Sequence, residues 1–310
     1  MAERYDVIVI GAGPAGLAAA IYASRARLKT LVVDESVPGG QVKTTHKVSN
    51  YPGFAEDVSG KELAQAFAAQ AQRFGAKLAK AVEITAHELG GAIKRLTLDE
   101  EDVVEAPVVI VATGARPREL GLPGEAKYKG RGISWCATCD GAYFEGQDIH
   151  VIGGGNSAVE EALFLTQFAK SVTIIHQFDE FQAEPASVHE LRENPKVRIL
   201  LSHEPRAFHG EGGLQEIEVE ELKTKARRRL PTDGVFEFIG MTPRTDLLEG
   251  YVDLVQGGYV ETSEAMETKV PGLFAAGDLR SKRFRQITTA VADGTIAALA
   301  AQKYLKEHRA

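Results

Sequence analysis

The chain has 310 residues, of which 44% are hydrophobic and 25% charged, and its formal net charge is −7. These values are ordinary for a globular protein of about two domains, and the acidic balance excludes general affinity for nucleic acid. No apolar run approaches the roughly 20 residues of a membrane helix, and the N-terminus reads as a strand without a signal peptide. We therefore expect a cytoplasmic protein that does not bind a membrane.

The first predicted elements are a strand, a glycine-rich turn and a helix. Residues 5–10 read as a buried strand, residues 17–25 as an alanine-rich helix, and the turn between them is Gly11-Ala12-Gly13-Pro14-Ala15-Gly16. This is the GxGxxG pattern in the context that a dinucleotide-binding site requires. A second strand, at residues 29–33, ends at Asp34, an acid that can accept hydrogen bonds from ribose hydroxyls. The alternative is a glycine-rich turn that holds no ligand.

Each glycine of this turn has a role in the predicted site. Gly11 permits the tight turn, Gly13 lets the backbone approach a pyrophosphate, and Gly16 lets the helix pack closely on the strand. The N-terminus of the helix then faces the negative charge of the phosphates.

The segment up to the first linker contains one helix and several short strands. Residues 59–74 form a predicted amphipathic helix with Ser59 as its N-cap. Residues 79–104 alternate as short strands with a Gly90-Gly91 hairpin turn, and residues 107–112 form another apolar strand. The stretch from Arg116 to Gly124, which contains proline and glycine, then marks a linker.

Both cysteines of the chain lie in one short motif, Trp135-Cys136-Ala137-Thr138-Cys139-Asp140. Two residues separate them, which is the spacing at which two thiols close a small reversible disulfide. Dithiol chemistry needs a group that donates and accepts protons, and Asp140 directly follows the second cysteine. Half of a zinc site and two unrelated buried cysteines are the alternatives. Because zinc needs four ligands and no histidine pair has suitable spacing, we expect a redox pair and no metal.

The strand, glycine turn and helix then occur a second time. Residues 148–152 form the predicted strand, residues 159–168 the helix, and the GxGxxA turn between them is Gly153-Gly154-Gly155-Asn156-Ser157-Ala158. Two such units indicate two nucleotide sites, and the simplest architecture inserts one dinucleotide-binding domain into the other. The next strand, residues 171–175, ends in His176-Gln177, where arginines would bind a 2′-phosphate. On charge alone, this strand end disfavours NADPH.

The C-terminal part contains a basic cluster and a last strand–helix pair. Lys223 to Arg229 is predicted to be a solvated hairpin tip or, alternatively, a docking patch for an acidic partner. Residues 234–240 form a strand, and Pro243 marks a second linker. A strand that ends in Gly277-Asp278 precedes a helix at residues 288–305, and the turn between them is suited to a bound cofactor.

These motifs, in this order, resemble those of the low-molecular-weight thioredoxin reductases over nearly the whole chain. Besides the CxxC stretch and both glycine turns, the segments that carry the resemblance are Pro38-Gly39-Gly40-Gln41, Asn50-Tyr51-Pro52-Gly53-Phe54, Ala112-Thr113-Gly114-Ala115, Ala275-Ala276-Gly277-Asp278 and Arg285-Gln286. The resemblance implies an α/β fold with two Rossmann-like dinucleotide-binding domains, the second inserted in the first. It implies a discontinuous FAD-binding domain at residues 1–115 and 245–310, and an NAD(P)-like domain with the CxxC redox centre at residues 116–244.

The resemblance also implies which residues bind each cofactor. Those expected to bind FAD are Gly11, Gly13, Pro14, Ala15, Gly16, Asp34, Glu35, Gly40, Gln41, Asn50, Thr113, Gly114, Gly277, Asp278, Arg285 and Gln286. Those expected to bind the nicotinamide dinucleotide are Gly153, Gly155, Asn156, Ser157, Ala158, His176 and Gln177.

In such a reductase, electrons pass through FAD to the dithiol and then to thioredoxin or a similar small redox protein. The resemblance implies that Cys139 faces the flavin, that Cys136 attacks the disulfide of the partner, and that Asp140 is the acid–base group. It further implies a homodimer whose two domains alternate between two orientations, with hinges at Arg116-Pro117 and Pro243-Arg244.

The sequence departs from the family at the nicotinamide site. NADPH-dependent members carry HRRxxxR after the second strand of that site, whereas this chain has His176, Gln177, Phe178 and Gln182 and lacks all three arginines. Each lost contact between a cation and a phosphate costs about 1.5–3 kcal/mol. NADH is therefore the expected donor and NADPH is disfavoured. A protein donor such as ferredoxin is second, with the basic cluster as its candidate docking patch.

Two other functions fit parts of the pattern. An FAD-dependent NADH oxidase would turn over with oxygen alone and would not need Cys136. A non-catalytic flavin sensor would need no exchange dithiol, and the intact motif from Cys136 to Asp140 argues against it. We therefore predict an FAD-dependent disulfide reductase.

Overall fold

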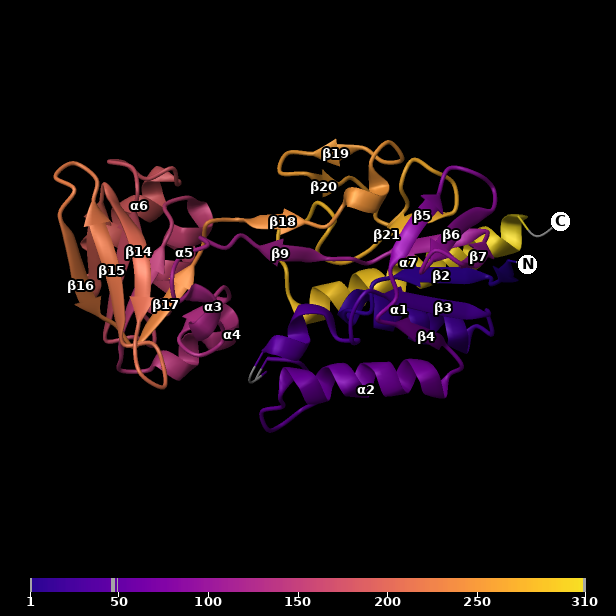
Figure 1. The fold of residues 1–310 in the computed structure, drawn as a ribbon, viewed down its shortest axis with the longest axis horizontal. Helices are drawn as coiled ribbons and strands as arrows, with labels where there is room; N and C mark the ends of the chain where they lie inside the picture. The colour runs from indigo at the N-terminus through magenta and orange to yellow at the C-terminus, as the bar shows by residue number, and fades with distance from the viewer. Residues whose placement is uncertain (1, 46–47, 49, 309–310) are drawn as a thin grey trace. The chain divides into compact units, whose positions relative to one another are not determined.

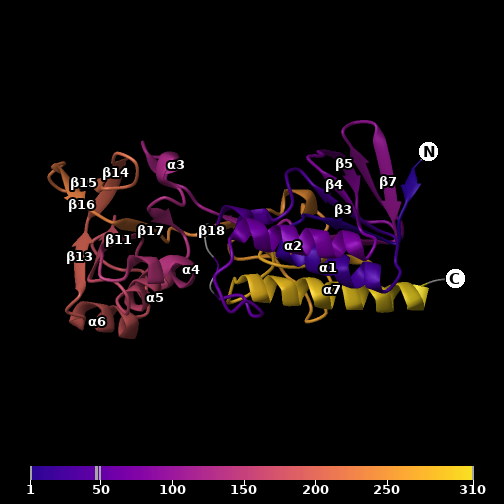
Figure 2. The same cartoon turned by 90° about the horizontal axis from the view of Figure 1, so that it is seen from below.

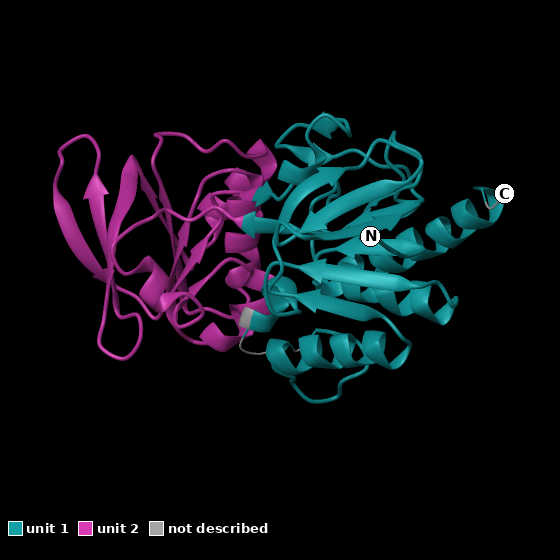
Figure 3. Cartoon of the chain, turned by 45° about the vertical axis from the view of Figure 1, so that its right-hand side comes forward, with its two compact units in different colours: residues 1–116, 242–310 teal, residues 117–241 magenta. Residues whose placement is uncertain are grey.

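The computed structural model describes residues 2–45, 48 and 50–308, and the chain divides into two compact units (Figures 1 and 3). Unit 1 consists of residues 1–116 and 242–310, and unit 2 consists of residues 117–241. The two breaks lie one and three residues from the domain boundaries expected from the sequence. The short strands at the two breaks, β9 (Ala115–Pro117) and β18 (Met241–Pro243), pair with each other.

Unit 1 is built on a five-stranded parallel sheet. Its strands, in spatial order, are β21 (Leu273–Ala275), β8 (Val108–Val111), β2 (Val7–Ile10), β3 (Thr30–Asp34) and β4 (Lys77–Lys80). Alternate residues of β2 belong to two different hydrophobic clusters, one on each face of the sheet. Because both faces are covered, β2 and β8 are buried throughout and read as continuous apolar runs.

Three helices pack together in unit 1, and Figure 2 shows them from below. They are α1 (Pro14–Arg25), α2 (Gly60–Arg73) and α7 (Ile287–His308). A Cβ atom on Gly294 of α7 would lie 1.9 Å from the Ala15 carbonyl oxygen, so α7 packs directly on the backbone of α1. The predicted N-cap of α2 is confirmed, because Ser59 and Glu62 form a reciprocal capping box.

A second, four-stranded sheet of unit 1 covers the other face of the parallel sheet. Its strands are β1 (Glu3–Arg4), β7 (Asp102–Ala106), β6 (Lys94–Leu98) and β5 (Ile84–Glu88). The expected hairpin turn at Gly90-Gly91 joins β5 to β6, which run antiparallel. The smaller elements of unit 1 are η1 (Gly40–Thr44), η3 (Asp246–Leu248), β19 (Leu254–Val255) and β20 (Tyr259–Val260).

Unit 2 is also built on a five-stranded parallel sheet. Its strands, in spatial order, are β10 (Ile133–Ser134), β17 (Gly234–Glu237), β11 (Asp148–Ile152), β12 (Ser171–His176) and β13 (Val197–Leu201). One face packs on α5 (Asn156–Leu165) and α6 (Pro185–Glu193). The other face packs on an antiparallel sheet of β14 (His203–His209), β15 (Glu216–Glu221) and β16 (Arg227–Pro231). Three short helices complete the unit: α3 (Glu125–Tyr128), α4 (Ala137–Asp140) and η2 (Gly141–Phe144).

The helices that follow the two glycine turns begin three residues earlier than the sequence predicts. Their first residues are Pro14 and Asn156 rather than Leu17 and Val159. Proline suits a first helical position because its ring fixes φ and its missing N–H has no intrahelical acceptor there. The last residue of each GxGxx(G/A) pattern therefore lies inside a helix.

Nothing in the part of the chain that the structure describes has the length and apolar character of a membrane-spanning helix.

One fully buried lysine occupies the start of β6 in unit 1. Lys94 has no exposed surface, and its Nζ donates a hydrogen bond of 2.6 Å to the Pro271 carbonyl oxygen. No carboxylate among the described residues forms an ion pair with it. Burial alone lowers the pKa of Lys94 to about 8, because the charged ammonium loses its hydration.

This lysine should make stability depend on pH. Its pKa falls from 10.5 to about 8 on folding, so between these values the folded state binds fewer protons and the free energy of unfolding rises with pH. Lys94→Met removes this contribution, so the stability of the variant relative to the parent should fall by about 2–3 kcal/mol from pH 7 to pH 10. Thermal or urea unfolding at both pH values measures it, with Lys61→Met, an exposed lysine of α2, as the control. A difference that does not change with pH would contradict the prediction.

Candidate active site

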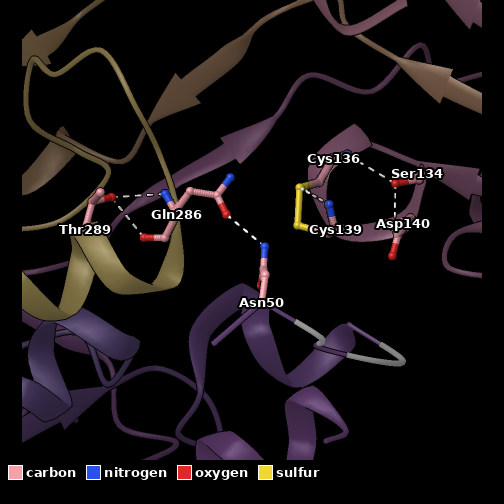
Figure 4. The surroundings of a disulfide bond; sticks show 7 residues. All are labelled: Asn50, Ser134, Cys136, Cys139, Asp140, Gln286 and Thr289. Atoms are coloured by element: carbon pink, nitrogen blue, oxygen red, sulfur yellow. Dashed lines mark hydrogen bonds between the residues drawn. A yellow bond between two sulfur atoms is a disulfide. The ribbon is translucent and has the colours of Figure 1, made fainter. Parts of the chain in front are cut away.

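The two cysteines form a disulfide in unit 2, as the spacing predicts (Figure 4). Cys136 follows β10 in an extended conformation and is the N-cap of α4, and Cys139 lies within that helix. A single helical turn therefore brings the two sulfur atoms together. Both residues are half-buried, so the disulfide is neither sealed in the core nor fully exposed.

The two sulfur atoms differ in their electrostatic surroundings. The backbone N–H of Cys139 donates to the sulfur of Cys136 at 3.2 Å. After reduction, this donor would stabilise negative charge on Cys136 more than on Cys139. The geometry therefore favours Cys136 as the sulfur that carries the thiolate.

The predicted acid, Asp140, belongs to the same turn. Its backbone N–H donates to the Cys136 carbonyl oxygen at 3.1 Å, and its carboxylate accepts a 2.5 Å hydrogen bond from the Ser134 hydroxyl. Ser134 also accepts a hydrogen bond from the backbone N–H of Cys136, at 3.1 Å. Sequence reasoning missed Ser134, because a serine two residues before a cysteine carries no pattern of its own.

The described parts of the chain contain no set of side chains that could bind a metal ion. No group of three or more histidine, cysteine, aspartate or glutamate side chains there is arranged to hold an ion. The two cysteines, which half of a zinc site would require, are bonded to each other.

In unit 1, the first glycine turn forms a backbone cradle at the N-terminus of α1. A Cβ atom on Gly16 would lie 1.8 Å from the Gly11 carbonyl oxygen, and one on Gly40 would lie 3.0 Å from the Cα of Gly13. A Cβ atom on Gly277 would lie 2.8 Å from the Cβ of Ala15. The segments that contain Gly11, Gly40 and Gly277 are remote in sequence, and they therefore meet at the start of α1. Pro14 is the first residue of the helix.

The N-termini of α1 and α5 share a feature that sets them apart from α2. Neither has a side-chain cap, and neither has an acidic residue in its first turn, whereas α2 has a complete capping box. No side chain within either helix therefore compensates the positive end of its dipole at the glycine turns. This arrangement fits a phosphate group at each helix.

The two acids at the end of β3, Asp34 and Glu35, have protein partners in the structure. Asp34 accepts hydrogen bonds from the backbone N–H groups of Ala12, at 2.6 Å, and Ser36, at 2.8 Å. Asp34 thus ties the glycine turn to the end of β3. Glu35 forms a 2.7 Å ion pair with Arg244.

The other residues predicted around the flavin lie on loops that hydrogen bonds tie together. Thr113 donates to the Arg244 carbonyl oxygen at 2.6 Å, next to Gly114, and the Gln41 amide donates to the Ala115 carbonyl oxygen. Asn50 makes a long contact of 3.4 Å with the side chain of Gln286 (Figure 4).

Two polar atoms of the C-terminal loop of unit 1 are buried without a hydrogen bond. They are Oδ1 of Asp278, whose contact is an ion pair with Lys282 at 3.0 Å, and Nε of Arg285, whose guanidinium lies over the Tyr259 ring. Buried polar atoms normally have partners. Together with the glycine cradle and the uncapped α1, the unpartnered Nε of Arg285 fits a polar dinucleotide cofactor such as FAD.

Asp293, which sequence reasoning also missed, holds this loop against α7. Its carboxylate accepts from the backbone N–H of Gly277 and from Lys282, both at 3.1 Å, and from Arg280 at 3.2 Å. The available signal was the position of Asp293, which is the only acid between residues 287 and 305 of an alanine-rich helix.

The second glycine turn, in unit 2, also packs closely on its surroundings. A Cβ atom on Gly153 would lie 2.4 Å from the Phe238 carbonyl oxygen. Gly155 caps α5, Asn156 and Ser157 are exposed in its first turn, and Ala158 is buried. The side chain of Asn156 already accepts a 2.7 Å hydrogen bond from the Glu184 N–H.

His176 lies at the end of β12 beneath this turn. Its ring stacks on Phe181 with 5.7 Å between the ring centroids, and a Cβ atom on Gly154 would lie 2.3 Å from its Nδ1. Burial lowers the pKa of His176, which keeps the ring neutral at pH 7. Gln177 and Phe178, next in the chain, are exposed.

No cation lies in the segment from His176 to Gln182, and Asp179 and Glu180 add two exposed carboxylates. A phosphate near this strand end would therefore meet negative charge from the protein.

The basic cluster of the sequence is largely neutralised inside its own sheet. Arg227 contacts Glu220 at 2.9 Å and Glu218 at 3.6 Å, and Arg229 contacts Glu216 at 3.5 Å. These residues face each other across the β15–β16 ladder. The arrangement favours a solvated hairpin over a docking patch, because Arg227 and Arg229 both already pair with acids of β15.

Comparisons of the sequence and of the structure with known proteins find relatives of the same kind. Residues 5–294 match the model of the pyridine nucleotide-disulphide oxidoreductase family. A "34.2 kDa protein in rubredoxin operon" of Clostridium pasteurianum is 46% identical, with 98% of each chain covered. A thioredoxin reductase of Bacillus subtilis strain 168 is 43% identical over 98% of this chain and 95% of its own. The crystal structure of a thioredoxin reductase from Streptococcus pyogenes matches with a TM-score of 0.92 at 39% identity, covering 99% of this chain and all of that one.

One buried acid near the cysteines was not singled out from the sequence. Glu237 ends β17 with 2% of its surface exposed, and neither carboxyl oxygen has a hydrogen bond. The carboxyl of Glu125 and the indole of Trp135, the neighbour of Cys136, lie beside it. Burial first, and the charge of Glu125 second, raise the pKa of Glu237 to about 9, so the group is protonated at pH 7.

Glu237 should therefore destabilise the fold as the pH rises. Folding raises its pKa from 4.5 to about 9, so between these values the folded state binds more protons and the free energy of unfolding falls with increasing pH. Glu237→Gln imitates the protonated acid, so its stabilisation relative to the parent should grow by more than 1 kcal/mol between pH 5 and pH 8. Urea unfolding at the two pH values tests this, with Glu193→Gln, an exposed acid of α6, as the control. If the difference in stability between Glu237→Gln and the parent is the same at both pH values, Glu237 is ionised in the folded protein.

Proposed function

Since this chain belongs to the pyridine nucleotide-disulphide oxidoreductase family, we propose that it is an FAD-dependent disulfide reductase acting on thioredoxin or a similar small redox protein. The observation that carries the proposal is the half-buried Cys136–Cys139 disulfide with Asp140 in the same helical turn. The thioredoxin reductases among its relatives support the choice of partner.

The proposed flavin site is the glycine cradle of unit 1. The uncapped N-terminus of α1 would hold the pyrophosphate over Gly13, and the buried polar atoms of Asp278 and Arg285 would bind the polar parts of the cofactor. Bound FAD would supply a carrier that takes two electrons from the donor and passes them to the disulfide.

The dithiol transfers these two electrons by thiol–disulfide exchange. The Cys136 thiolate attacks one sulfur of the partner disulfide, so that a mixed disulfide forms and a partner thiolate leaves. Cys139 then attacks the sulfur of Cys136, which releases the second partner thiolate and restores the Cys136–Cys139 disulfide. The partner gains two electrons and two protons, and Asp140 is the group proposed to move protons between the thiols.

The proposed electron donor is NADH rather than NADPH. The uncapped N-terminus of α5 supports a dinucleotide at the second glycine turn, where Gly153, Gly155 and Ser157 would surround the pyrophosphate. A neutral His176, an uncharged Gln177 and two nearby carboxylates give no compensation for a 2′-phosphate dianion. A 2′-phosphate at this strand end would lose part of its hydration and gain no cationic partner, so its binding would be unfavourable.

A protein donor such as ferredoxin is the second candidate. The missing arginines after β12 favour it, whereas the internal ion pairs of Arg227 and Arg229 reduce the charge of its proposed docking patch. We also propose a cytoplasmic homodimer, with β9 and β18 as hinges between the two units.

Single cysteine substitutions test the roles of the two thiols. Cys136→Ser should abolish partner reduction, a loss of more than a thousandfold, while the donor still reduces the flavin, because the nucleophile is gone and the flavin site is intact. Cys139→Ser should also stop turnover but leave a Cys136 that traps the partner as a stable mixed disulfide. Coupled turnover and intact mass measure these outcomes. Full disulfide reductase activity in Cys136→Ser would overturn the assignment. Oxidation of the donor by oxygen alone, at a rate that Cys136→Ser does not change, would support the oxidase alternative.

Flavin bleaching under anaerobic conditions tests the donor. NADH should bleach the flavin at least tenfold faster than NADPH at equal concentration, and Gln177→Arg with Phe178→Arg should reverse this ratio by supplying charged partners for the 2′-phosphate. Gln177→Leu with Phe178→Leu is the control. Bleaching by reduced ferredoxin alone would reject NADH and favour the protein donor. No thiol-dependent turnover with any donor would favour the sensor.

A further inference from the structure

Residues 136–140, from Cys136 to Asp140, form a turn that we call the redox turn. Ser134 connects the two ends of this turn (Figure 4). Its Oγ lies 2.5 Å from Oδ2 of Asp140, at the end of the turn, and 3.1 Å from the backbone nitrogen of Cys136, at the start. Only 7% of the serine surface is exposed. The hydroxyl is therefore the shared partner of the acid and of the attacking cysteine.

The direction of both hydrogen bonds follows from the donors available. The backbone N–H of Cys136 can only donate, so Oγ of Ser134 accepts that bond. The hydroxyl has one hydrogen, which it donates to Oδ2 of Asp140. A hydroxyl that donates to a carboxyl group stabilises the ionised form over the protonated form. Ser134 therefore favours the carboxylate state of Asp140.

Among Ser134, Cys136 and Asp140, only the serine belongs to a strand of the central sheet. It ends β10, which pairs in parallel with β17, where Ser134 lies opposite Phe236, a residue with no exposed surface. Cys136 to Asp140 lie in and beside a helix of four residues, which has few internal hydrogen bonds of its own. Through Ser134, the acid is fixed to the central sheet of unit 2 rather than only to the short helix.

We propose that Ser134 is a positioning residue of the dithiol site: its hydroxyl keeps Asp140 ionised and fixed at the redox turn, ready to accept a proton from the dithiol. In the exchange reaction, which rests on the proposed function, the carboxylate takes the proton of the Cys136 thiol and leaves a thiolate. The S–S bond of the partner breaks as Cys136 attacks, and the leaving partner thiolate takes that proton from Asp140. The carboxylate is then regenerated, so no further reagent is needed.

The test measures thiol reactivity, which requires neither donor nor partner. The full-length protein is reduced chemically, freed of reductant and reacted with 2,2′-dithiodipyridine, a disulfide probe that reacts with thiols in acid as well as at neutral pH. The rate in the parent should show an acidic inflection that Asp140→Asn abolishes. Ser134→Ala should move this inflection upward by about one pH unit, the loss expected for one hydrogen bond to a carboxylate.

Two controls separate this role from a general structural one. Ser171→Ala removes a similar serine–aspartate bond in unit 2, the 2.6 Å contact of Ser171 with Asp148, and should leave the inflection in place. In the Asp140→Asn background, Ser134→Ala should change nothing further in the pH profile. Ser134→Thr and Ser134→Val form a pair of equal shape, so only the valine variant should move the inflection, and this pair decides the question if the alanine variant does not fold.

An inflection that stays in place in Ser134→Ala or Ser134→Val would overturn the proposal. A shift of the inflection in the reduced protein, together with no turnover toward any partner, would uphold the role of Ser134 and refute the proposed function. If the reductase is active, the acid limb of its pH–rate profile should move by the same amount as the inflection.

Discussion

The close approach of backbone to backbone at the start of α1 is the constraint on which unit 1 depends. Gly16 lies against the carbonyl oxygen of Gly11, and Gly294 of α7 lies against the carbonyl oxygen of Ala15, with no room for a Cβ atom at either glycine. These two contacts bring α1 against its strand and α7 against α1. The N-terminus of α1 is thereby fixed at the point where the loops carrying Gly40 and Gly277 meet. A substitution in this small volume would displace several segments at once, because packed interiors do not deform continuously.

Unit 2 also has a tightly packed glycine turn, but the side chains around it differ in charge from those of a phosphate site. The turn at Gly153 to Ala158 is as tightly packed as the first one, but the neighbouring strand end carries a neutral histidine between aromatic rings instead of cations. On the other side of the sheet, Glu237 and Glu125 put acidic groups close to the tryptophan that precedes the redox turn. The unit therefore combines the same kind of backbone geometry with a strand end, residues 176–182, that offers no lysine or arginine.

The fold and the centre of the site were predictable because they depend on local patterns. The strand, glycine turn and helix units occur in sequence order, and two cysteines separated by two residues can meet within one helical turn, so no long-range contact had to be inferred. Ser134 and Asp293 were missed because each acts through a contact that only the folded chain creates. The pairing of Arg227 and Arg229 with acids of β15 was missed for the same reason, since cross-strand neighbours depend on register. The early starts of α1 and α5 show that a glycine motif and the helix after it overlap.

The pairing of β9 with β18 has a consequence for how such a chain can be built and rebuilt. Residues 117–241 form one uninterrupted stretch whose entry and exit strands lie side by side. At the level of the gene, unit 2 is thus one continuous insertion, and every strand of the parallel sheet of unit 1 lies outside it. This one segment carries the redox turn, Ser134 and the second glycine turn together.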